Sequence, residues 1–546
     1  MQAWTILMAA LLAGGLALPS SGDRRGWPVW GKDRKNSHHA REERAIGADN
    51  ASRLTVKWVF DLGQFNDCGS VDCSVSATPT VDARRLYVPD WAGNLYAIDA
   101  RSGRLVWLRR IEDYSGIPGD FSRTSPTIRD GRLYLGSRTS ATVFAVEART
   151  GRLLWKSPPL DDHPDALITA APVVHAGRVY VGISSLESSA AGDPAYPCCS
   201  FRGSVVALDA RTGRKRWQTH TIPAPPAGVD PSAWFSGAAV WGSSFPIDEE
   251  RGALYVGTGN NYQVPRELSE CVKRAGADAA AFALCLEQLD RGDNYVDSLL
   301  ALDLDTGEVH WAARLQGYDP WNVACAPNAV FRDNCPDPPG PDYDFGQAPM
   351  LWRAKIRGRK RDLVGAGQKS GTFWALDRRT GRVVWTAAPG PGSPLGGMHW
   401  GSATDGRRIY TTNTFSAGFF SNGLWSALDG ATGALLWQTR APGAFGRFLT
   451  APVTLANGVL YGATMNAEGD NLFALDAATG EILWSFASGG SVNAAPSLVD
   501  GVLYWPSGYL NNFLGSSNDK LYAFEVPGDR PRRPPGGRDD DDRDDD

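Results

Sequence analysis

One motif recurs seven times along this chain and constrains its fold more than any other feature. It reads Ala-x-Asp-x-x-Thr-Gly-x-x-x-Trp, with small variations such as Glu147 in place of the Asp. The copies are Ala97–Trp107, Ala145–Trp155, Ala207–Trp217, Ala301–Trp311, Ala375–Trp385, Ala427–Trp437 and Ala474–Trp484. In each copy a strand enters a tight turn, where the Gly supplies a positive φ, and a second strand leads to the Trp. Repeats of this length predict a propeller or solenoid rather than a row of separate domains.

The two ends of the chain carry complementary halves of one more repeat. Leu521–Glu525 reads as the strand before the turn, but no turn or Trp follows it. The missing half, a strand that ends in Trp, lies near the other terminus at Leu54–Trp58. We therefore predict an all-β, eight-bladed β-propeller in which this N-terminal strand closes the last blade and protects its edge.

The segments outside the repeats predict three further parts. Residues 1–22 resemble a secretory signal, because an apolar run from Ile6 to Leu18 is followed by small residues and is too short for a membrane span. Residues 23–49 form an N-terminal arm before the propeller of residues 50–526. Residues 527–546, rich in Pro, Gly, Arg and Asp, predict a disordered acidic tail. We expect a periplasmic or secreted protein.

The tail also accounts for the net charge of the chain. Residues 539–546 contain seven Asp and one Arg, a charge of −6, whereas the whole chain carries −5, so the remainder sums to about +1. The acidity therefore says nothing about the propeller. We expect no nucleic-acid partner and no stable membrane span.

Eight cysteines indicate an oxidising compartment. Their closeness in sequence suggests the pairs Cys68–Cys73, Cys198–Cys199, Cys271–Cys285 and Cys325–Cys335, although spacing alone leaves the connectivity open. The chain has no Cys-x-x-Cys-His motif for covalent haem attachment. Any haem-based electron acceptor must therefore be a separate molecule.

The spacing of the repeats is uneven, and the excess marks a functional region. From Trp58 onward, successive repeat Trp residues lie 49, 48, 62, 94, 74, 52 and 47 residues apart. The three long intervals contain Cys198-Cys199, the Cys271–Cys285 segment and the Cys325–Cys335 segment, and 265–289 looks partly helical. Insertions that cluster on one face of a repeat fold usually carry its function, although disulfide-stapled surface loops are the simpler interpretation of the last two.

The blade motif resembles that of the quinoprotein alcohol dehydrogenases, which are eight-bladed propellers. Several stretches look closest to the polyvinyl-alcohol dehydrogenases of this family, namely 196–203, 257–262, 340–346 and 365–371. The resemblance covers about residues 50–526. It implies that pyrroloquinoline quinone (PQQ) and a metal ion, Ca²⁺ or a lanthanide, bind on the propeller axis.

The resemblance also implies a set of metal ligands. The matching Glu is Glu187 and the matching Asn is Asn260, both oxygen ligands suited to a hard cation. The family's Asp touches the metal and acts as the base, and a Lys or Arg normally follows it by somewhat under thirty residues. Lys369 follows Asp342 by 27 residues but follows the alternative, Asp319, by 50, so the resemblance favours Asp342. Asp344 matches an additional Asp of lanthanide-preferring relatives, but it could equally be a solvated loop residue.

Further residues match contacts to the quinone. The matches are Arg123 for a carboxylate, the hydroxyls of Thr169 and Ser184, Trp241 as the floor under the ring, Lys369 near the quinone oxygens, and His399 as a weaker contact. Alone, each of these is an ordinary packing or surface residue; their joint order along the chain favours the functional interpretation. Cys198 and Cys199 are a further candidate contact to the quinone. Their position differs from that in methanol-oxidising relatives: there the vicinal disulfide precedes the Arg that Arg123 matches, whereas here the pair follows Glu187. Ser76 stands where some relatives carry a Glu.

The activity implied is the oxidation of an alcohol, secondary and perhaps polymeric by the likeness. Asp342 would take the hydroxyl proton and Lys369 would stabilise the developing oxyanion, with electrons leaving to an external acceptor such as cytochrome c. One rival is a non-enzymatic propeller that uses the same repeats as a binding or assembly scaffold. A second is a quinoprotein sugar dehydrogenase.

Overall fold

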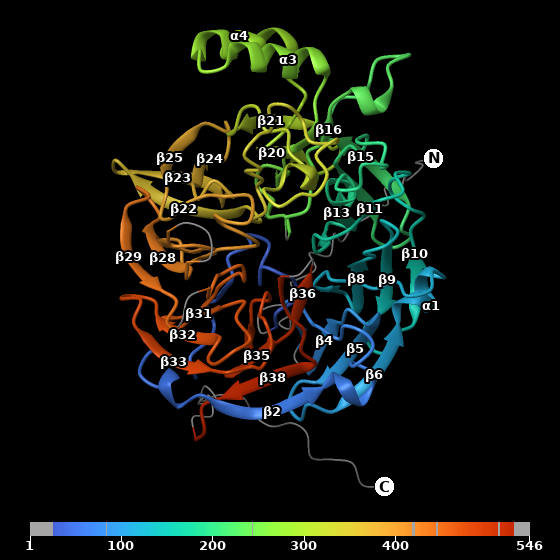
Figure 1. The fold of residues 1–546 in the computed structure, drawn as a ribbon. Helices are drawn as coiled ribbons and strands as arrows, with labels where there is room; N and C mark the ends of the chain where they lie inside the picture. The colour runs from blue at the N-terminus through green and yellow to red at the C-terminus, as the bar shows by residue number, and fades with distance from the viewer. Residues whose placement is uncertain are drawn as a thin grey trace, which may run out of the picture.

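The computed structural model of this protein describes residues 26–528, except 83, 243, 418–420, 444–445 and 512–513. Its strands form eight sheets with four main strands each, arranged as blades around a central axis (Figure 1). Each blade runs antiparallel from a short inner strand to an outer strand. The predicted all-β, eight-bladed propeller is confirmed. The predicted signal, 1–22, and nearly all of the predicted tail lie outside the described residues.

The blades are numbered here in chain order. Blade 1 contains β3 (Thr80–Val81), β4 (Arg85–Pro89), β5 (Asn94–Asp99) and β6 (Leu105–Arg110); blade 2, β7 (Thr127–Arg129), β8 (Arg132–Gly136), β9 (Val143–Glu147) and β10 (Leu153–Lys156); blade 3, β12 (Val173–His175), β13 (Arg178–Ser185), β14 (Ser204–Asp209) and β15 (Lys215–His220); blade 4, β17 (Ile247–Asp248), β18 (Ala253–Gly257), β20 (Ser298–Asp303) and β21 (Val309–Arg314).

Blade 5 contains β22 (Met350–Ile356), β23 (Arg359–Gly367), β24 (Phe373–Asp377) and β25 (Val383–Ala387); blade 6, β26 (Ala403–Thr404), β27 (Arg408–Asn413), β28 (Leu424–Asp429) and β29 (Leu435–Arg440); blade 7, β30 (Thr454–Ala456), β31 (Val459–Ala463), β32 (Leu472–Asp476) and β33 (Ile482–Phe486); blade 8, β34 (Ser497–Val499), β35 (Val502–Pro506), β38 (Lys520–Glu525) and β2 (Thr55–Asp61).

Short elements decorate this frame. They are β1 (His39–Ala40), β11 (Ala166–Leu167), β16 (Ser236–Gly237), β19 (Asn261–Gln263), β36 (Tyr509–Asn511) and β37 (Leu514–Ser516), the helices α1 (Ile111–Ser115), α2 (Glu187–Ala190), α3 (Arg266–Ala275) and α4 (Ala279–Leu289), and the 3-10 helices η2 (Ala51–Arg53), η3 (Leu62–Gln64), η4 (Pro231–Ala233) and η5 (Val323–Cys325). The predicted helical character of 265–289 is therefore present as α3 and α4.

Blade 8 is built from both ends of the propeller, as predicted. β2 pairs antiparallel with β38, and the register places Trp58 opposite Ala523. This pairing supplies the outer strand that the last repeat lacks, so the ring closes without a free sheet edge at the junction. The apolar core lies largely between neighbouring blades; one cluster, for example, joins Tyr180 of blade 3 to Leu254 of blade 4.

The conserved spacing within the motif has a single geometric cause. The Trp of one repeat packs on the turn Gly of the next blade, and its indole nitrogen donates to a main-chain carbonyl just after that blade's motif Asp or Glu. Trp107 shows the pattern: it donates to the carbonyl of Ala148 at 3.1 Å and lies against Gly151, where an added Cβ would lie 2.8 Å from the indole ring. Equivalent bonds join Trp58 to Ala100, Trp155 to Ala210, Trp217 to Leu304, Trp311 to Arg378 and Trp437 to Ala477. Gly is therefore required both for the positive φ and for space.

One copy departs from this pattern. Trp385 packs on Gly433, yet the carbonyl of Gly430 that it would use accepts instead from the indole of Trp352, at 2.8 Å. The indole nitrogen of Trp385 has no partner among the described residues. The competing Trp352 on inner strand β22 explains the difference.

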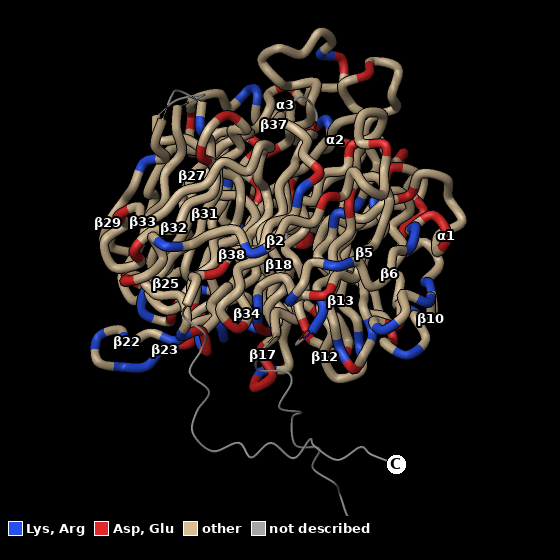
Figure 2. Tube along the Cα trace, turned by 90° about the horizontal axis from the view of Figure 1, so that it is seen from below, with Lys and Arg blue, Asp and Glu red and all other residues tan. Residues whose placement is uncertain are grey.

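The connections between strands separate into two faces. The connections from the second to the third strand of a blade, and from each blade to the next, lie on one face with α2, α3 and β37 (Figure 2). The short turns that join the first strand to the second, and the third to the fourth, lie on the opposite face, where the labels of β12, β17 and β34 are seen. All three long insertions belong to the first face, which we name the loop face. The second is named the turn face.

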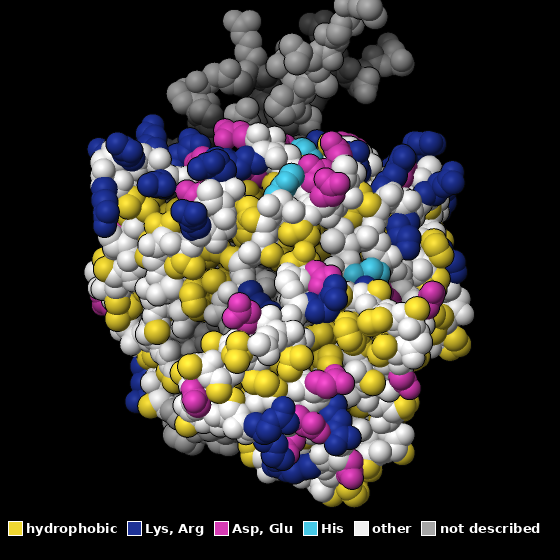
Figure 3. Space-filling model, turned by 90° about the horizontal axis from the view of Figure 1, so that it is seen from above, with side chains coloured by type: hydrophobic (Ala, Val, Ile, Leu, Met, Phe, Trp, Pro, Cys, Tyr) yellow, Lys and Arg dark blue, Asp and Glu magenta, His cyan; other side chains and the backbone are white. Residues whose placement is uncertain are grey.

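The outer surface is mixed in character. In the view of Figure 3, apolar side chains form a band across the ring, with Lys and Arg interspersed with Asp and Glu above and below it. No helix among the described residues combines the length and apolarity that a bilayer crossing requires.

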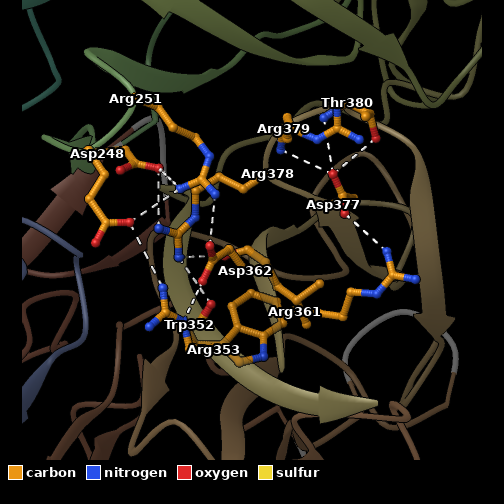
Figure 4. Close-up of polar contacts among 12 residues, drawn as sticks. Asp248, Arg251, Trp352, Arg353, Arg361, Asp362, Asp377, Arg378, Arg379 and Thr380 are labelled. Carbon is orange, nitrogen blue, oxygen red and sulfur yellow. Dashed lines mark hydrogen bonds and ion pairs between the residues drawn. The ribbon is translucent and has the colours of Figure 1, made fainter. Parts of the chain in front are cut away.

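Blades 4 and 5 are joined by a buried ionic network (Figure 4). Arg378 occupies the motif position that is Ala, Leu or Gly in the other copies. Its guanidinium contacts Asp248 at 3.2 Å and donates to the carbonyl of Trp352 at 3.0 Å. Arg251 bridges Asp248 and Asp362, at 3.0 and 2.7 Å. Because these groups are shielded from water, removing one leaves its partners incompletely compensated.

We expect Arg378→Ala to lower the free energy of unfolding by about 3 kcal/mol, since breaking a buried ion pair is strongly destabilising. Urea denaturation of the two proteins measures the difference. The neighbouring Arg379→Ala is a matched control, because that side chain is exposed and should change stability by less than about 0.5 kcal/mol. Equal loss in both variants would show that the network does not stabilise the blade junction.

Candidate active site

The three stretched repeats place disulfide-linked loops on the loop face. All four predicted pairs are formed: Cys68–Cys73, Cys198–Cys199, Cys271–Cys285 and Cys325–Cys335. Cys271–Cys285 ties α3 to α4, which project from the ring (Figure 1). The Cys198–Cys199 pair is directly followed by Ser200 and Phe201, whose amides contact Glu187, one of the polar residues described below.

A buried ion cluster lies at the end of β23 and in the long connection before β22. The ammonium of Lys369 contacts Asp342 at 3.0 Å and Asp344 at 2.8 Å. Burial raises the pKa of Asp342 well above its ordinary value, an effect that Lys369 only partly opposes. Burial lowers the pKa of Lys369, but the two carboxylates outweigh this effect and leave it above its ordinary value. The cluster therefore holds two buried carboxylates against one buried ammonium group.

Asp319 supports this cluster from behind. One of its carboxylate oxygens accepts the amide of Asp342 at 2.8 Å and the other accepts the amide of Tyr343 at 2.6 Å. Burial raises the pKa of Asp319 to about 6. Of the two candidate bases, Asp342 carries the side chain that contacts Lys369, whereas Asp319 binds the backbone that carries Asp342. Gly340 makes this approach possible, because a Cβ there would lie 2.2 Å from Asp319.

Asn260 joins the cluster from blade 4. Its amide nitrogen donates to the carbonyls of Asn261, at 2.8 Å, and Trp321, at 2.7 Å. Because only the NH₂ group can make both bonds, its carbonyl oxygen, the predicted ligand atom, faces away from them. The backbone amide of Asn260 donates to Asp344, so the two predicted ligands are in direct contact.

Glu187 begins α2 and is completely buried. Its carboxylate accepts the amides of Ser200, at 2.6 Å, and Phe201, at 2.9 Å, directly after the vicinal disulfide. The Nε2 of His163 lies 3.2 Å from the same carboxylate. Since the amide of Asp165 donates to Nδ1 of His163, the ring proton is on Nε2 and is donated to Glu187. The carboxylate of Glu187 has about four lone-pair directions, and these three hydrogen bonds use three of them, which leaves one for a cation.

The predicted ligands influence one buried phenol, that of Tyr262. Burial raises its pKa well above the ordinary value, and the charges of Asp344, Glu187 and Asp342 raise it further. Among the described residues, no three His, Cys, Asp or Glu side chains converge as a preformed cation cage. The available donors, three carboxylates and one amide carbonyl, nevertheless fit a hard cation such as Ca²⁺ or a lanthanide.

An aromatic wall adjoins the ion cluster. Lys369 lies 5.4 Å from the ring centroid of Trp241, and Trp400 meets the same ring edge-on at 5.4 Å. Arg123 lies over Trp400 at 5.0 Å and over Trp91 at 5.7 Å. No ion pair joins Arg123 to a carboxylate within the described part of the chain. Its charge is thus available to an anionic ligand.

Arg123 and Trp400 of this wall border a cavity on the propeller axis. Its walls include Trp30, Thr78, Arg123, Thr169 and Trp400. The hydroxyl of Thr78 is buried without a partner among the described residues, and no acidic side chain lines the cavity. A cation, free hydroxyls and aromatic rings fit a planar ligand that carries carboxylates, as PQQ does.

The other predicted contacts lie around this centre. Thr169 donates its hydroxyl to the carbonyl of Trp241 at 2.9 Å, and Ser184 lies buried near the end of β13. His399 bonds the carbonyl of Gly396 at 2.9 Å, and its ring centroid lies 6.4 Å from that of Trp241. Burial lowers the pKa of His399 to about 4, so the ring is neutral at pH 7.

Sequence reasoning missed several residues of this centre. His163 holds Glu187 across 24 residues, Trp400 covers Trp241, and Trp30 reaches the cavity from the N-terminal arm. Tyr262 lay in a stretch noted for its likeness but received no role. Trp400 stands outside the motif positions, as Trp241 does, and directly follows the predicted contact His399, a signal that could have identified it; Trp30 has no such neighbour.

The sequence of this chain is similar to those of known proteins along most of its length. A family profile described as outer membrane protein assembly factor BamB matches residues 24–313, 369–453 and 421–528. Polyvinylalcohol dehydrogenase from Sphingopyxis sp. (strain 113P3) is 30% identical over 92% of this chain and 76% of its own length.

Two solved structures share the fold. Quinohemoprotein alcohol dehydrogenase from Comamonas testosteroni has a TM-score of 0.68 at 22% identity, covering 94% of this chain and 82% of its own. A europium-containing methanol dehydrogenase has a TM-score of 0.67 at 17% identity, covering 92% of this chain and 98% of its own. With the relative that is 30% identical along most of both chains, these findings show that the chain belongs to the PQQ-dependent quinoprotein alcohol dehydrogenase family.

Proposed function

We propose that this protein oxidises secondary alcohols, polymeric ones among them, with bound PQQ and Ca²⁺ or a lanthanide, and passes the electrons to an external acceptor such as cytochrome c. The observation that carries the proposal is the buried Asp342–Lys369–Asp344 cluster beside an axial cavity with an unpaired Arg123. When bound, the quinone supplies the two-electron oxidant and the cation acts as a Lewis acid.

The roles of the side chains follow from their chemistry. Arg123 binds a carboxylate of the ligand, Thr169 and Ser184 offer hydroxyls, and Trp241 offers a flat surface. Glu187, Asn260 and Asp344, together with Asp342, hold the cation. Asp342 accepts the proton of the substrate hydroxyl, because its carboxylate is held in the cluster beside Lys369. Lys369 stabilises negative charge that develops on oxygen.

The substrate class rests on the names of two relatives and on exposed apolar side chains that adjoin Glu187 and the vicinal disulfide. Polyvinylalcohol dehydrogenases from Sphingopyxis sp. and Pseudomonas sp. are 30% and 28% identical to this chain. Leu186, next to Glu187, and Val323, next to Asn322, are 39% and 37% exposed. Asn322 contacts Cys198 at 3.7 Å, so Val323 belongs to the surroundings of the vicinal disulfide. Exposed apolar side chains there suit a substrate with a hydrocarbon backbone.

The electron acceptor and the cellular location are inferred from sequence motifs, from the names of relatives and from the disulfides. The absence of a Cys-x-x-Cys-His motif requires a separate carrier if the acceptor contains haem. Names of other relatives include cytochrome c, for example 1-butanol dehydrogenase (cytochrome c) from Thauera butanivorans. Four disulfides and the predicted signal at 1–22 favour the periplasm or secretion. We retain 23–49 as the arm, 50–526 as the propeller and 527–546 as a tail.

Reconstitution tests the proposal. The purified protein is loaded with PQQ and either Ca²⁺ or La³⁺, and dye reduction is followed with 2-propanol, polyvinyl alcohol and glucose. We expect turnover with the two alcohols and none with glucose. Turnover with glucose alone would indicate a sugar dehydrogenase. No quinone binding with either cation would instead favour a scaffold propeller, the function named in the matching family profile.

A further inference from the structure

The N-terminal arm does not lie outside the propeller; it runs through the centre of the ring. Residues 26–43 follow the innermost edges of the blades. Trp27 pairs with Val81 of β3 in both directions, at 2.7 and 3.0 Å. The arm carbonyls of Pro28, Arg34, Lys35, Ser37 and His38 then accept amides from the inner strands of blades 2, 4, 5, 6 and 7, namely Ile128, Ile247, Leu351, Thr404 and Leu455.

The path ends at blade 8. The side chain of Glu43 accepts the amide of Gly501 at 3.1 Å, in the turn between β34 and β35. The arm therefore contacts seven of the eight blades through hydrogen bonds, in their order around the ring. Inner strands otherwise present unpaired backbone groups to the axis, and the arm satisfies many of them.

The arm is itself a packed unit. Trp27 and His38 are fully buried, Trp30 is 6% exposed, and the ring centroids of Trp30 and His38 are 4.2 Å apart. The indole of Trp27 donates to the carbonyl of Trp30 at 3.1 Å, and Lys32 binds Glu42 and the carbonyl of Gly26. The edge-on contact with His38 is the one that holds the Trp30 ring in position, since the Trp27 bond reaches only the Trp30 backbone.

Trp30 carries the arm into the axial cavity. It lines that cavity with Arg123, Thr169 and Trp400. Its ring also packs against Gly401, where an added Cβ would lie 2.4 Å from it. Gly401 directly follows Trp400, the residue that contacts both Arg123 and Trp241.

We infer that the arm is an axial plug that closes the cofactor cavity on the turn face, and that Trp30 is a positioning residue for the quinone. By packing on Gly401, Trp30 supports the neighbouring Trp400, whose ring contacts Arg123 and Trp241. The inference rests on the quinone binding proposed above. It adds a segment far from the predicted ligands to the cofactor site.

The test compares Trp30 with Trp27, which is buried in the same arm but does not line the cavity. PQQ binding is measured by equilibrium dialysis with Ca²⁺ or La³⁺ present, and thermal stability is measured on the same samples. We expect Trp30→Ala to raise the Kd for PQQ about tenfold, and Trp30→Phe to raise it less. Trp27→Phe should lower the Tm but leave the Kd unchanged within about twofold.

The outcomes separate the two proposals. If the wild-type protein binds PQQ and the Trp30 variants bind it equally well, the arm has only a structural role and the inference is wrong. If the wild-type protein does not bind PQQ with either cation, the proposed function itself fails, and the inference fails with it. If Trp30→Ala is too unstable to purify, the Kd for PQQ of Trp30→Phe, which keeps an aromatic ring, is compared with that of Trp27→Phe. A higher Kd in Trp30→Phe supports the inference, and equal Kd values contradict it.

Discussion

Asp342→Asn is expected to lower kcat about a thousandfold, since general base catalysis contributes roughly 10²–10⁴-fold. The amide keeps the size of the side chain and can still accept a hydrogen bond from Lys369, but it cannot take a proton. PQQ binding should survive, because Arg123 and the aromatic wall are unaffected. Stopped-flow reduction of the loaded enzyme by 2-propanol measures the chemical step directly.

Asp319→Asn is the matched variant for this experiment. Asp319 accepts two backbone amides, and the Asn oxygen can retain at least one of them. We expect a smaller loss of kcat than for Asp342→Asn. A thousandfold loss in Asp319→Asn with near-normal turnover in Asp342→Asn would reverse the assignment and make Asp319 the base.

Glu187→Gln is expected to weaken cation binding by about 100-fold or more, because changes even outside the ligand shell typically cost 10–100-fold. The substitution removes a negative charge. In the wild-type protein the carboxylate accepts hydrogen bonds from three donors: the amides of Ser200 and Phe201 and the Nε2 of His163. In the variant an NH₂ group, itself a donor, replaces one carboxylate oxygen and cannot accept these bonds. Isothermal titration with Ca²⁺ and La³⁺ measures the affinity, and activity should return partly at high cation concentration.

His163→Gln distinguishes a ligand from its support. This variant leaves the Glu187 carboxylate in place and removes only one of its three hydrogen-bond donors. We expect cation affinity to fall by about tenfold, less than in Glu187→Gln. Unchanged affinity in Glu187→Gln would exclude Glu187 from the ligand set.

Local repetition made the scaffold predictable. Each motif carries its own turn Gly and the Trp that docks on the next blade, so the contact between blades is encoded within about a dozen neighbouring residues, as with Trp107 on Gly151. The half repeats at the two ends predicted the β2–β38 closure for the same reason. The disulfide pairs were predictable because each joins residues close in sequence.

The site was only partly predictable, because its residues come from connections whose paths no repeat constrains. Spacing favoured Asp342 over Asp319, but only the fold brings the two into contact and aims one at Lys369. His163 and Glu187 likewise meet through loop geometry.

The sequence by itself determined the ring and its closure, because periodic burial and tight-turn geometry act between near neighbours. Only the tertiary structure decided the course of residues 26–43. Their hydrogen-bond partners lie up to several hundred residues away, on the inner edge of a ring that exists only after the blades have assembled. An arm without periodicity carries no local signal of such contacts, and for that reason Trp30 entered the site unforeseen.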